Sequence, residues 1–170
     1  MKNIIIITPV YNDWESFSKL INEINKTISN FKDISFKLIA INDGSKNKAP
    51  NLKLPSNLEL IEILNMKKNQ GHAICLANGI KYALKNFQLD YLILMDADGE
   101  DRPEELAELI NKANKYKNIS VVAKRIKRSE GIIFRIFYSI HKLITLVFTG
   151  KLINFGNYSI LTKKDAAIII

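Results

Sequence analysis

The sequence predicts a single α/β domain over residues 1–170, built on a mostly parallel sheet with helices on both faces. The first observation is size and balance, because 170 residues with 47% hydrophobic and 25% charged side chains suit one globular domain. The second is that short apolar runs alternate with segments of helical periodicity. The third is that polar motifs follow four of the predicted strands, and in such sheets ligands bind beyond the carboxyl ends of the strands.

The first part of the chain predicts two strands around one helix. Residues 4–7 form a continuous apolar run that is typical of a buried strand. Apolar residues then recur at helical spacing over 14–28. A second strand is expected over 36–41, where it ends at the turn signature of residues 42–45. The polar segment 46–57 contains two prolines and is expected to be a surface loop.

Three more strands and two helices are expected further along. Residues 58–64 form the third predicted strand, 71–84 a helix, and 91–95 the fourth strand, which ends at an aspartate. A helix is predicted over 103–115, because proline suits its first position and the two glutamates that follow favour its positive end. The fifth strand is expected over 119–123.

Composition excludes several classes of protein. The chain is too apolar for a disordered tail, and it contains no internal repeat. Its one cysteine, Cys75, cannot form an internal disulfide, which fits a reducing compartment. The apolar run at residues 4–7 is too short for a signal peptide, and no 18-residue stretch is free of charge. We therefore expect a cytoplasmic domain without a transmembrane helix.

The formal net charge of +8 is unevenly distributed. Residues 112–151 contain ten Lys or Arg and only one acidic residue, Glu130. Such a segment predicts a positive surface that faces phosphate, nucleic acid or anionic lipid. Residues 96–108 have the opposite character, with seven carboxylates against Arg102. The combination suggests a site for a metal ion and a phosphate.

The most specific motif follows the fourth predicted strand. Asp96 and Asp98 are separated by one residue, and two carboxylates at a strand end can share a hard divalent cation, Mg²⁺ or Mn²⁺. Such a cation keeps positions open for diphosphate oxygens. Glu100 is a candidate third ligand. The alternative is that these acids form turns and cap helices, and Asp101 is expected to cap the helix that begins at Pro103.

Two other strand-end motifs carry weaker signals. Asp43 is either a turn residue or a carboxylate that accepts a hydrogen bond from a nucleobase. Gly71 allows the backbone to approach a ligand closely, and the helix that follows favours an anion. His72 taken alone predicts a capping or structural histidine rather than a metal ligand.

Four motifs together resemble family 2 glycosyltransferases in order and spacing. They are Thr-Pro-Val-Tyr-Asn-Asp at 8–13, Asn-Asp-Gly-Ser at 42–45, Asn-Gln-Gly-His at 69–72 and Asp-Ala-Asp-Gly-Glu-Asp at 96–101. The resemblance covers essentially the whole chain and is strongest to the branch that includes dolichyl- and undecaprenyl-phosphate sugar synthases. It implies a GT-A fold, a nucleoside diphosphate sugar donor and inversion at the anomeric carbon.

The resemblance also implies roles for individual residues. Pro9, Tyr11 and Asp43 would hold the base and ribose. Asp96 and Asp98 would bind the metal and the diphosphate. The full set of candidates for nucleotide-sugar binding is Pro9, Tyr11, Asn12, Asp43, Asn69, Gly71 and Asp96.

By the same resemblance, residues 1–101 form the donor half of the domain and residues 102–170 part of the acceptor half. The chain is shorter than most complete members of the family, which leaves open that the fold is incomplete at its C-terminal end.

The second half carries two features that concern the acceptor. Arg125 and Arg128 follow the fifth predicted strand and are candidates for a catalytic clamp on a diphosphate or an acceptor phosphate, the alternative being a solvated loop. Residues 132–148 are amphipathic. They predict either a helix packed on the sheet or an interfacial helix on an anionic membrane.

The acceptor is inferred from a missing base. Asn154 stands where related transferases carry an aspartate, and neither Glu130 nor Asp165 has a convincing context. A hydroxyl acceptor needs a general base, whereas a phosphate acceptor is already anionic. This favours transfer to a lipid-linked phosphate at the inner face of the cell membrane, with the protein bound peripherally.

Two rival functions remain at this point. One is a glycosyltransferase that acts on a saccharide hydroxyl in surface polysaccharide. The other is a non-catalytic basic domain that binds nucleic acid or a membrane, although no nucleic-acid motif accompanies the basic segment. We therefore expect no nucleic-acid partner. The sugar, the base and the oligomeric state are not predicted.

Overall fold

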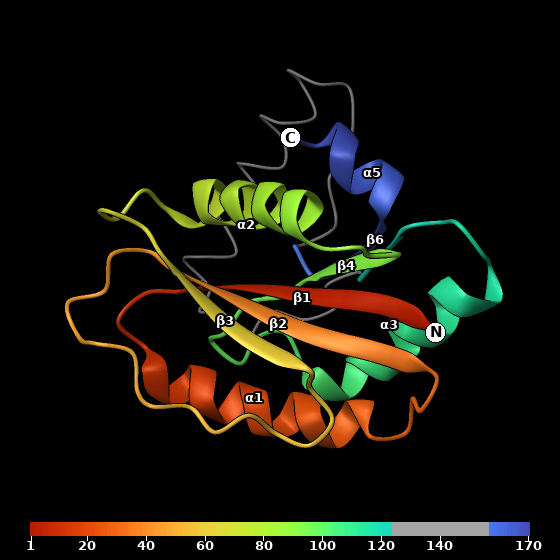
Figure 1. The fold of residues 1–170 in the computed structure, drawn as a ribbon, viewed down its shortest axis with the longest axis horizontal. Helices are drawn as coiled ribbons and strands as arrows, with labels where there is room; N and C mark the ends of the chain where they lie inside the picture. Colours follow the sequence, from red (N-terminus) through yellow and green to blue (C-terminus); the bar gives the residue numbers. More distant parts are fainter. Residues whose placement is uncertain (124–156) are drawn as a thin grey trace, which may run out of the picture.

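The described residues form a sheet of six strands in the order β3-β2-β1-β4-β6-β5 (Figure 1). The computed structural model describes residues 1–123 and 157–170. The four parallel strands are β1 (Lys2–Val10), β2 (Ile34–Asn42), β3 (Leu60–Asn65) and β4 (Tyr91–Leu94). Strand β6 (Ser159–Thr162) lies antiparallel between β4 and the short β5 (Val121–Val122). The predicted α/β fold with a mostly parallel sheet is confirmed.

Helices cover both faces of the sheet, as predicted. Figure 1 shows α1 (Trp14–Ile28) and α3 (Leu106–Lys115) on one side, and α2 (His72–Asn86) and α5 (Lys163–Ile168) on the other. A 3-10 turn, η1 (Pro103–Glu105), leads into α3. Each pair of helices has its own hydrophobic core against the sheet.

The central strand β1 has apolar side chains on both faces, and each face is covered by a layer of helices. Ile4 and Ile6 pack into the core beneath α1 and α3, whereas Ile5 and Ile7 pack into the core beneath α2. Because the strand is buried on both faces, its sequence is a continuous apolar run without alternation. The carboxyl end of β1 therefore lies between the two helical layers.

Helix α1 is specified locally at its start. Asp13 is its N-cap residue, and the Asp13 carboxylate accepts a hydrogen bond from the Ser16 N–H at 3.0 Å. The buried side chains of the helix recur at intervals of three and four residues and are Trp14, Phe17, Leu20, Ile21, Ile24 and Ile28. This apolar stripe fixes the helix on the sheet below β1 and β2.

The structure differs from the sequence prediction in the last part of the sheet. Strand β6 was not predicted, because its sequence, Ser-Ile-Leu-Thr, has only two consecutive apolar residues, although every position is buried. Residues 119–123 were predicted as a strand, but β5 contains only two residues and pairs with β6 rather than with β4. The inserted antiparallel strand therefore separates β5 from the parallel part.

Several predicted features lie outside the described residues. They include Arg125, Arg128, Glu130, Asn154 and the amphipathic segment 132–148. Within residues 1–123 and 157–170, no helix combines the length and apolar character needed to cross a bilayer.

Candidate active site

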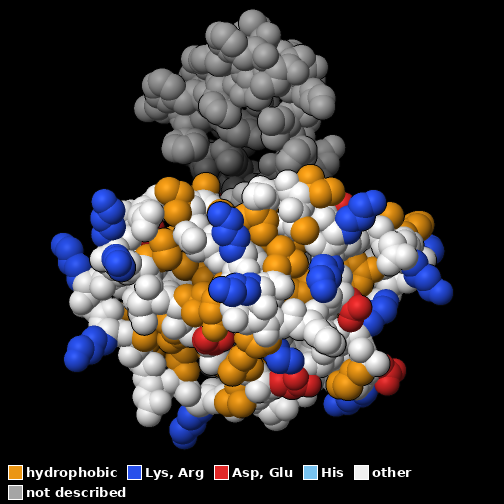
Figure 2. Space-filling view, turned by 45° about the horizontal axis from the view of Figure 1, so that its top comes forward, with side chains coloured by type: hydrophobic (Ala, Val, Ile, Leu, Met, Phe, Trp, Pro, Cys, Tyr) orange, Lys and Arg blue, Asp and Glu red, His pale blue; other side chains and the backbone are white. Residues whose placement is uncertain are grey.

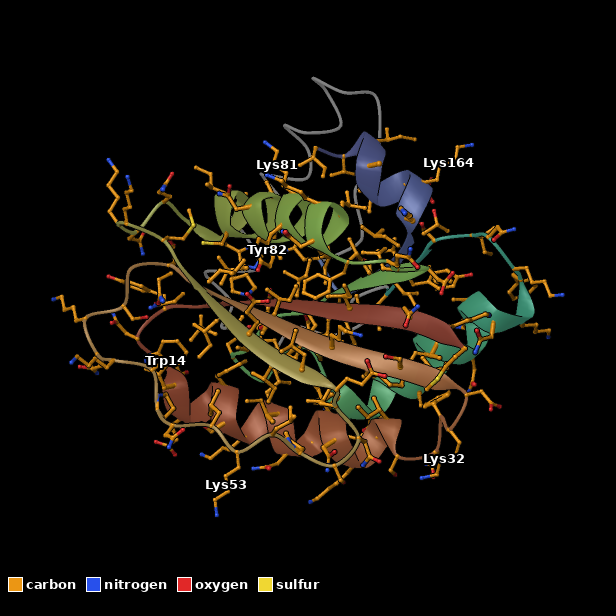
Figure 3. The ribbon with its side chains drawn as sticks, viewed as in Figure 1. Trp14, Lys32, Lys53, Lys81, Tyr82 and Lys164 are labelled. Carbon is orange, nitrogen blue, oxygen red and sulfur yellow. The ribbon has the colours of Figure 1, made fainter. Side chains whose placement is uncertain are left out.

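The loops that follow β1 and β2 are tied together at the carboxyl-end edge of the sheet. Asn12 has a φ of 58°, and its backbone N–H donates to Ser45 Oγ at 2.9 Å. Asn12 Oδ1 accepts from the Lys46 N–H at 2.8 Å. Trp14, labelled in Figure 3 at the start of α1, donates from Nε1 to the carbonyl of Asn47 at 3.0 Å. Asn12, a predicted nucleotide-binding residue, thus joins two loops of the site.

Asp43 holds the entry to α2 against the end of β2. Its side chain is only 4% exposed, and its two oxygens accept hydrogen bonds from the N–H groups of Gln70 at 2.7 Å and Gly71 at 2.9 Å. Gly44 has a φ of 71°, and a Cβ there would lie 2.7 Å from the Asn69 nitrogen. Only glycine therefore fits at this close approach. The predicted contact of Asp43 with a nucleobase stays a prediction.

Pro9 and Tyr11 lie at the end of β1 beside these loops. Pro9 pairs in register with Ile41 of β2, and Tyr11 follows directly after the strand. The Tyr11 side chain is 48% exposed, so its ring is accessible to a ligand at this edge. The structure thus brings the predicted base-binding residues to one edge.

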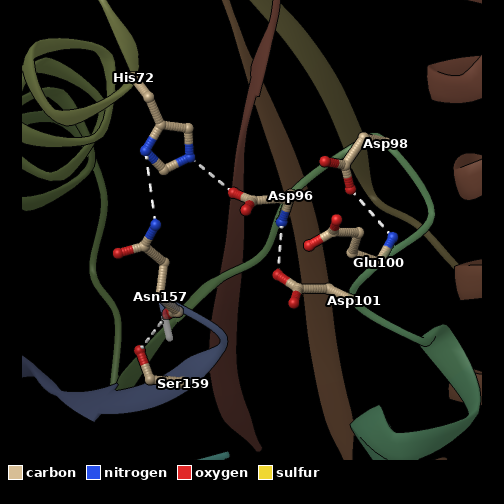
Figure 4. A network of polar contacts seen from close by, with 7 residues as sticks. All are labelled: His72, Asp96, Asp98, Glu100, Asp101, Asn157 and Ser159. Atoms are coloured by element: carbon tan, nitrogen blue, oxygen red, sulfur yellow. Dashed lines mark hydrogen bonds and ion pairs between the residues drawn. The ribbon is translucent and has the colours of Figure 1, made fainter. Parts of the chain in front are cut away.

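The acidic loop, residues 96–101, follows β4 at the same edge. Figure 4 shows hydrogen bonds within this loop and a contact from it to His72. The Asp96 N–H donates to Asp101 Oδ2 at 2.8 Å, and the Glu100 N–H donates to Asp98 Oδ1 at 2.9 Å. Gly99 supplies the positive φ of 86° that the turn requires. Asp101 was predicted to cap the following helix, but the N-cap residue is Arg102, and Asp101 closes the acidic loop instead.

His72, the first residue of α2, contacts the acidic loop. His72 Nε2 lies 2.6 Å from Asp96 Oδ1, and Asn157 Nδ2, two residues before β6, approaches His72 Nδ1 at 3.5 Å (Figure 4). The hydrogen bond with Asp96 raises the pKa of His72, and partial burial opposes this only in part. His72 was predicted to be a capping or structural histidine; its side chain contacts the acidic loop, and α2 has no side-chain cap.

The carboxylates of this loop fit a hard divalent cation. Asp96 and Asp98 each use Oδ1 in a hydrogen bond described above, which leaves the second oxygen of each for a metal. In the described part of the chain, no group of three or more His, Cys, Asp or Glu side chains is gathered to hold a metal ion. A cation here would therefore take its other oxygens from a ligand or from water, as Mg²⁺ usually does. Glu100 as a third ligand stays a prediction.

A cavity of about 540 Å³ opens beside the acidic loop. It lies between α1 and the segment from Ala97 to Glu105, and its lining includes Asp98, Lys19 and Arg102. Its volume falls in the range of small-molecule sites, which is roughly 300–1,000 Å³. The acidic loop therefore borders a space that a ligand can enter.

Among the described basic residues, Lys46 and Lys48 follow β2, and Lys67 and Lys68 follow β3, at this edge of the sheet. Figure 2 shows Lys and Arg spread over the face in view, among hydrophobic and polar side chains. The predicted clamp residues Arg125 and Arg128 lie outside the described residues. A positive surface facing the acceptor therefore stays a prediction.

The fold is the GT-A fold of glycosyltransferases, as comparison with solved structures shows. Staphylococcus aureus TarS, residues 1–349, matches with a TM-score of 0.62 at 17% identity, over 96% of this chain and 47% of that one. Glucosyl-3-phosphoglycerate synthase from Mycobacterium tuberculosis, crystallised with Mn²⁺, UDP and glucosyl-3-phosphoglycerate, matches with a TM-score of 0.65 at 13% identity, over 96% and 57%. At these identities the likeness concerns the fold.

The chain belongs to glycosyl transferase family 2, whose family model matches residues 5–167. An uncharacterized glycosyltransferase of Synechocystis is 28% identical over 166 residues, which cover 94% of this chain and 50% of that protein. Undecaprenyl-phosphate 4-deoxy-4-formamido-L-arabinose transferase of Salmonella choleraesuis is 27% identical over 177 residues, which cover 100% and 50%. The chain spans about half the length of these curated relatives.

Sequence reasoning found the carboxylates of the site but not their partners. The contact between His72 and Asp96 joins residues 24 positions apart, and Asn157 lies just before β6, a strand that was not predicted. One signal was available: in a parallel sheet, the helix that precedes β4 begins at the edge where β4 ends. That rule places His72 near Asp96 without any contact being known.

Proposed function

We propose that this domain transfers a sugar from a nucleoside diphosphate sugar to a lipid-linked acceptor of the polyprenyl phosphate type. Transfer would depend on Mg²⁺ or Mn²⁺ and would invert the anomeric carbon. The observation that carries the proposal is that the loop with Asp96 and Asp98 lies next to the N-terminus of α2. Nε2 of His72, the first residue of this helix, is 2.6 Å from Asp96 Oδ1. A metal-bound diphosphate needs carboxylates for the cation and N–H groups for its own oxygens, and this edge offers both.

The donor half is proposed to be residues 1–101. The base and ribose would lie against Pro9, Tyr11 and Asp43, where the loops after β1 and β2 are joined. Asn69 and Gly71, in the loop between β3 and α2, would contact the donor between these residues and the helix. The diphosphate would then lie between the N-terminus of α2 and the acidic loop.

The chemical step is proposed to rest on electrostatic stabilisation of the leaving diphosphate. Asp96 and Asp98, with Glu100, would hold the cation, which supplies positive charge at the departing oxygens when bound. Arg125 and Arg128 would donate charge-assisted hydrogen bonds to the same phosphates. The chain's carboxylates thus orient the leaving group while the sugar is attacked from the opposite side.

Three observations support a lipid phosphate as acceptor. The relative from Salmonella choleraesuis is named for transfer on undecaprenyl phosphate. A phosphate acceptor needs no general base, and Asn154 offers none. The amphipathic, basic segment 132–148 suits an anionic membrane surface. We therefore place the acceptor half in residues 102–170 and the protein at the inner face of the membrane.

A thermal-shift panel tests the donor. UDP-, GDP- and CDP-sugars are each added with and without Mn²⁺ at about 100 times their dissociation constant. A ligand at that concentration stabilises by about 2.7 kcal/mol. For a domain of this size, each kcal/mol raises Tm by about 2–4 °C. We expect one nucleotide class to raise Tm by about 5–10 °C, and only with the metal. No shift from any nucleotide sugar would contradict the proposal.

A partition assay tests the acceptor. The donor that binds is supplied with a radiolabelled sugar, together with undecaprenyl phosphate in detergent. We expect label to enter the organic phase, because the product carries the lipid. Label that appears only in water-soluble saccharide would support transfer to a saccharide hydroxyl. Salt-sensitive binding of nucleic acid without binding of any nucleotide sugar would favour a non-catalytic domain.

A further inference from the structure

Helix capping does not explain the position of the His72 side chain. It is the first residue of α2, whose N-cap residue is Gly71 and has no side-chain cap. The imidazole does not turn back onto its own helix. Figure 4 shows the ring extending from α2 across to the acidic loop, where Nε2 lies 2.6 Å from Asp96 Oδ1.

Asp96 is held from two sides by these contacts. Its backbone N–H donates to Asp101 Oδ2 at 2.8 Å, which fixes the main chain at the end of β4. His72 fixes the side chain by engaging one carboxylate oxygen. The second oxygen, Oδ2, is then held in one direction. The Asp96 side chain is 20% exposed, so this oxygen lies in a partly enclosed place.

The other ring nitrogen supports the same arrangement. Asn157 Nδ2 lies 3.5 Å from His72 Nδ1, a long contact from the segment that leads into β6. An amide N–H directed at Nδ1 favours the tautomer that carries its proton on Nε2. In that tautomer the ring donates its N–H to Asp96.

We propose that His72 is a positioning residue for the metal site, holding one oxygen of Asp96 by an N–H donor so that the other oxygen points at the cation. The inference rests on the proposed function, because it concerns the metal that Asp96 and Asp98 would share. Carboxylates that bind metals are commonly oriented by such hydrogen bonds, and their loss typically reduces metal affinity by about 10–100-fold. His72 acts on the cation through Asp96 and not as a ligand.

The experiment measures metal binding directly and compares three variants. His72→Leu removes the donor, and His72→Gln retains a neutral N–H group at a similar reach. Lys81→Ala is the matched control on the same helix, since Lys81 is exposed and points away from the sheet in Figure 3. Binding of Mn²⁺ is measured by the loss of the free-ion EPR signal in the presence of UDP, GDP or CDP, whichever nucleotide class raises Tm in the thermal-shift panel. The Tm of each protein in EDTA reports its folding.

We expect His72→Leu to weaken Mn²⁺ binding by about 10–100-fold. We expect His72→Gln to stay within about threefold of the original protein, and Lys81→Ala to be unchanged, while all variants remain folded in EDTA. Unchanged Mn²⁺ affinity in His72→Leu would overturn the inference, as would equal weakening in His72→Gln and His72→Leu. If the original protein binds no Mn²⁺ with UDP, GDP or CDP, the proposed metal-dependent function fails, and this inference falls with it.

Discussion

Asp43 offers a sharp test of how the donor edge is assembled. Its carboxylate is buried and accepts two backbone hydrogen bonds from the loop that leads into α2, from Gln70 and Gly71. The substitution Asp43→Asn preserves shape but turns one oxygen into an NH₂ group. That NH₂ group then faces a backbone N–H, so two donors meet where a donor and an acceptor met before.

The expected loss follows from the number of bonds affected. One of the two hydrogen bonds survives on the amide oxygen, and the other is lost together with the negative charge. A hydrogen bond to a charged group contributes about 1.5–3 kcal/mol. We therefore expect Asp43→Asn to reduce the free energy of unfolding by about 2–3 kcal/mol. Urea unfolding measures this as a lower midpoint with an unchanged m-value.

Asp13→Asn is the matched control, because it makes the same chemical change at an exposed helix cap. Asp13 accepts from one N–H, that of Ser16, and Asn caps a helix about as well as Asp does. We expect its loss to be at most about 1 kcal/mol, from the missing charge near the helix N-terminus. Equal losses in the two variants would refute the reasoning, since burial and the second N–H would then have no effect.

Three other predictions follow from single residues. Cys75 is buried and burial raises the pKa of its thiol to about 12, so it should not react with a thiol reagent at pH 8 until the protein is unfolded in urea. Gly79→Ala should lower the free energy of unfolding in urea by about 1–2 kcal/mol, because an added Cβ would lie 2.7 Å from Ile7 Cγ2. The cost of this overpacking exceeds the gain of about 1 kcal/mol in helix propensity. The hydrogen bond with Asp96 raises the pKa of His72 above its ordinary 6.5. In EDTA, the original protein should therefore exceed His72→Leu in free energy of unfolding by the full amount below pH 6.5, and this difference should shrink as pH rises through the folded pKa. A difference that grows with pH would contradict this prediction.

The parallel part of the fold was predictable because its signals are local. The run at residues 4–7 is apolar at every position since β1 is buried on both faces, and α1 shows a clear stripe together with its cap at Asp13. Strand β6 had no such signal. It is short, it is reversed, and its burial depends on β4 and β5, which are distant in sequence.

The candidate site was predictable as a list of residues but not as a network. The motif at Asp96 and Asp98 and its place after a buried strand are properties of the sequence. The bonds from Asp43 to the loop before α2, and from His72 to Asp96, depend on how separate strand ends meet. Asn12 illustrates the difference, since its side chain serves the joining of two loops.

The central claim is that Asp96 and Asp98 hold a cation for a nucleoside diphosphate leaving group. The most direct measurement is Mn²⁺-dependent hydrolysis and transfer of the donor sugar by Asp98→Ala, compared with Glu108→Ala on the exposed side of α3. We predict that Asp98→Ala abolishes both reactions at every metal concentration, while Glu108→Ala retains them. Turnover in Asp98→Ala at the rate of the original protein would contradict the claim.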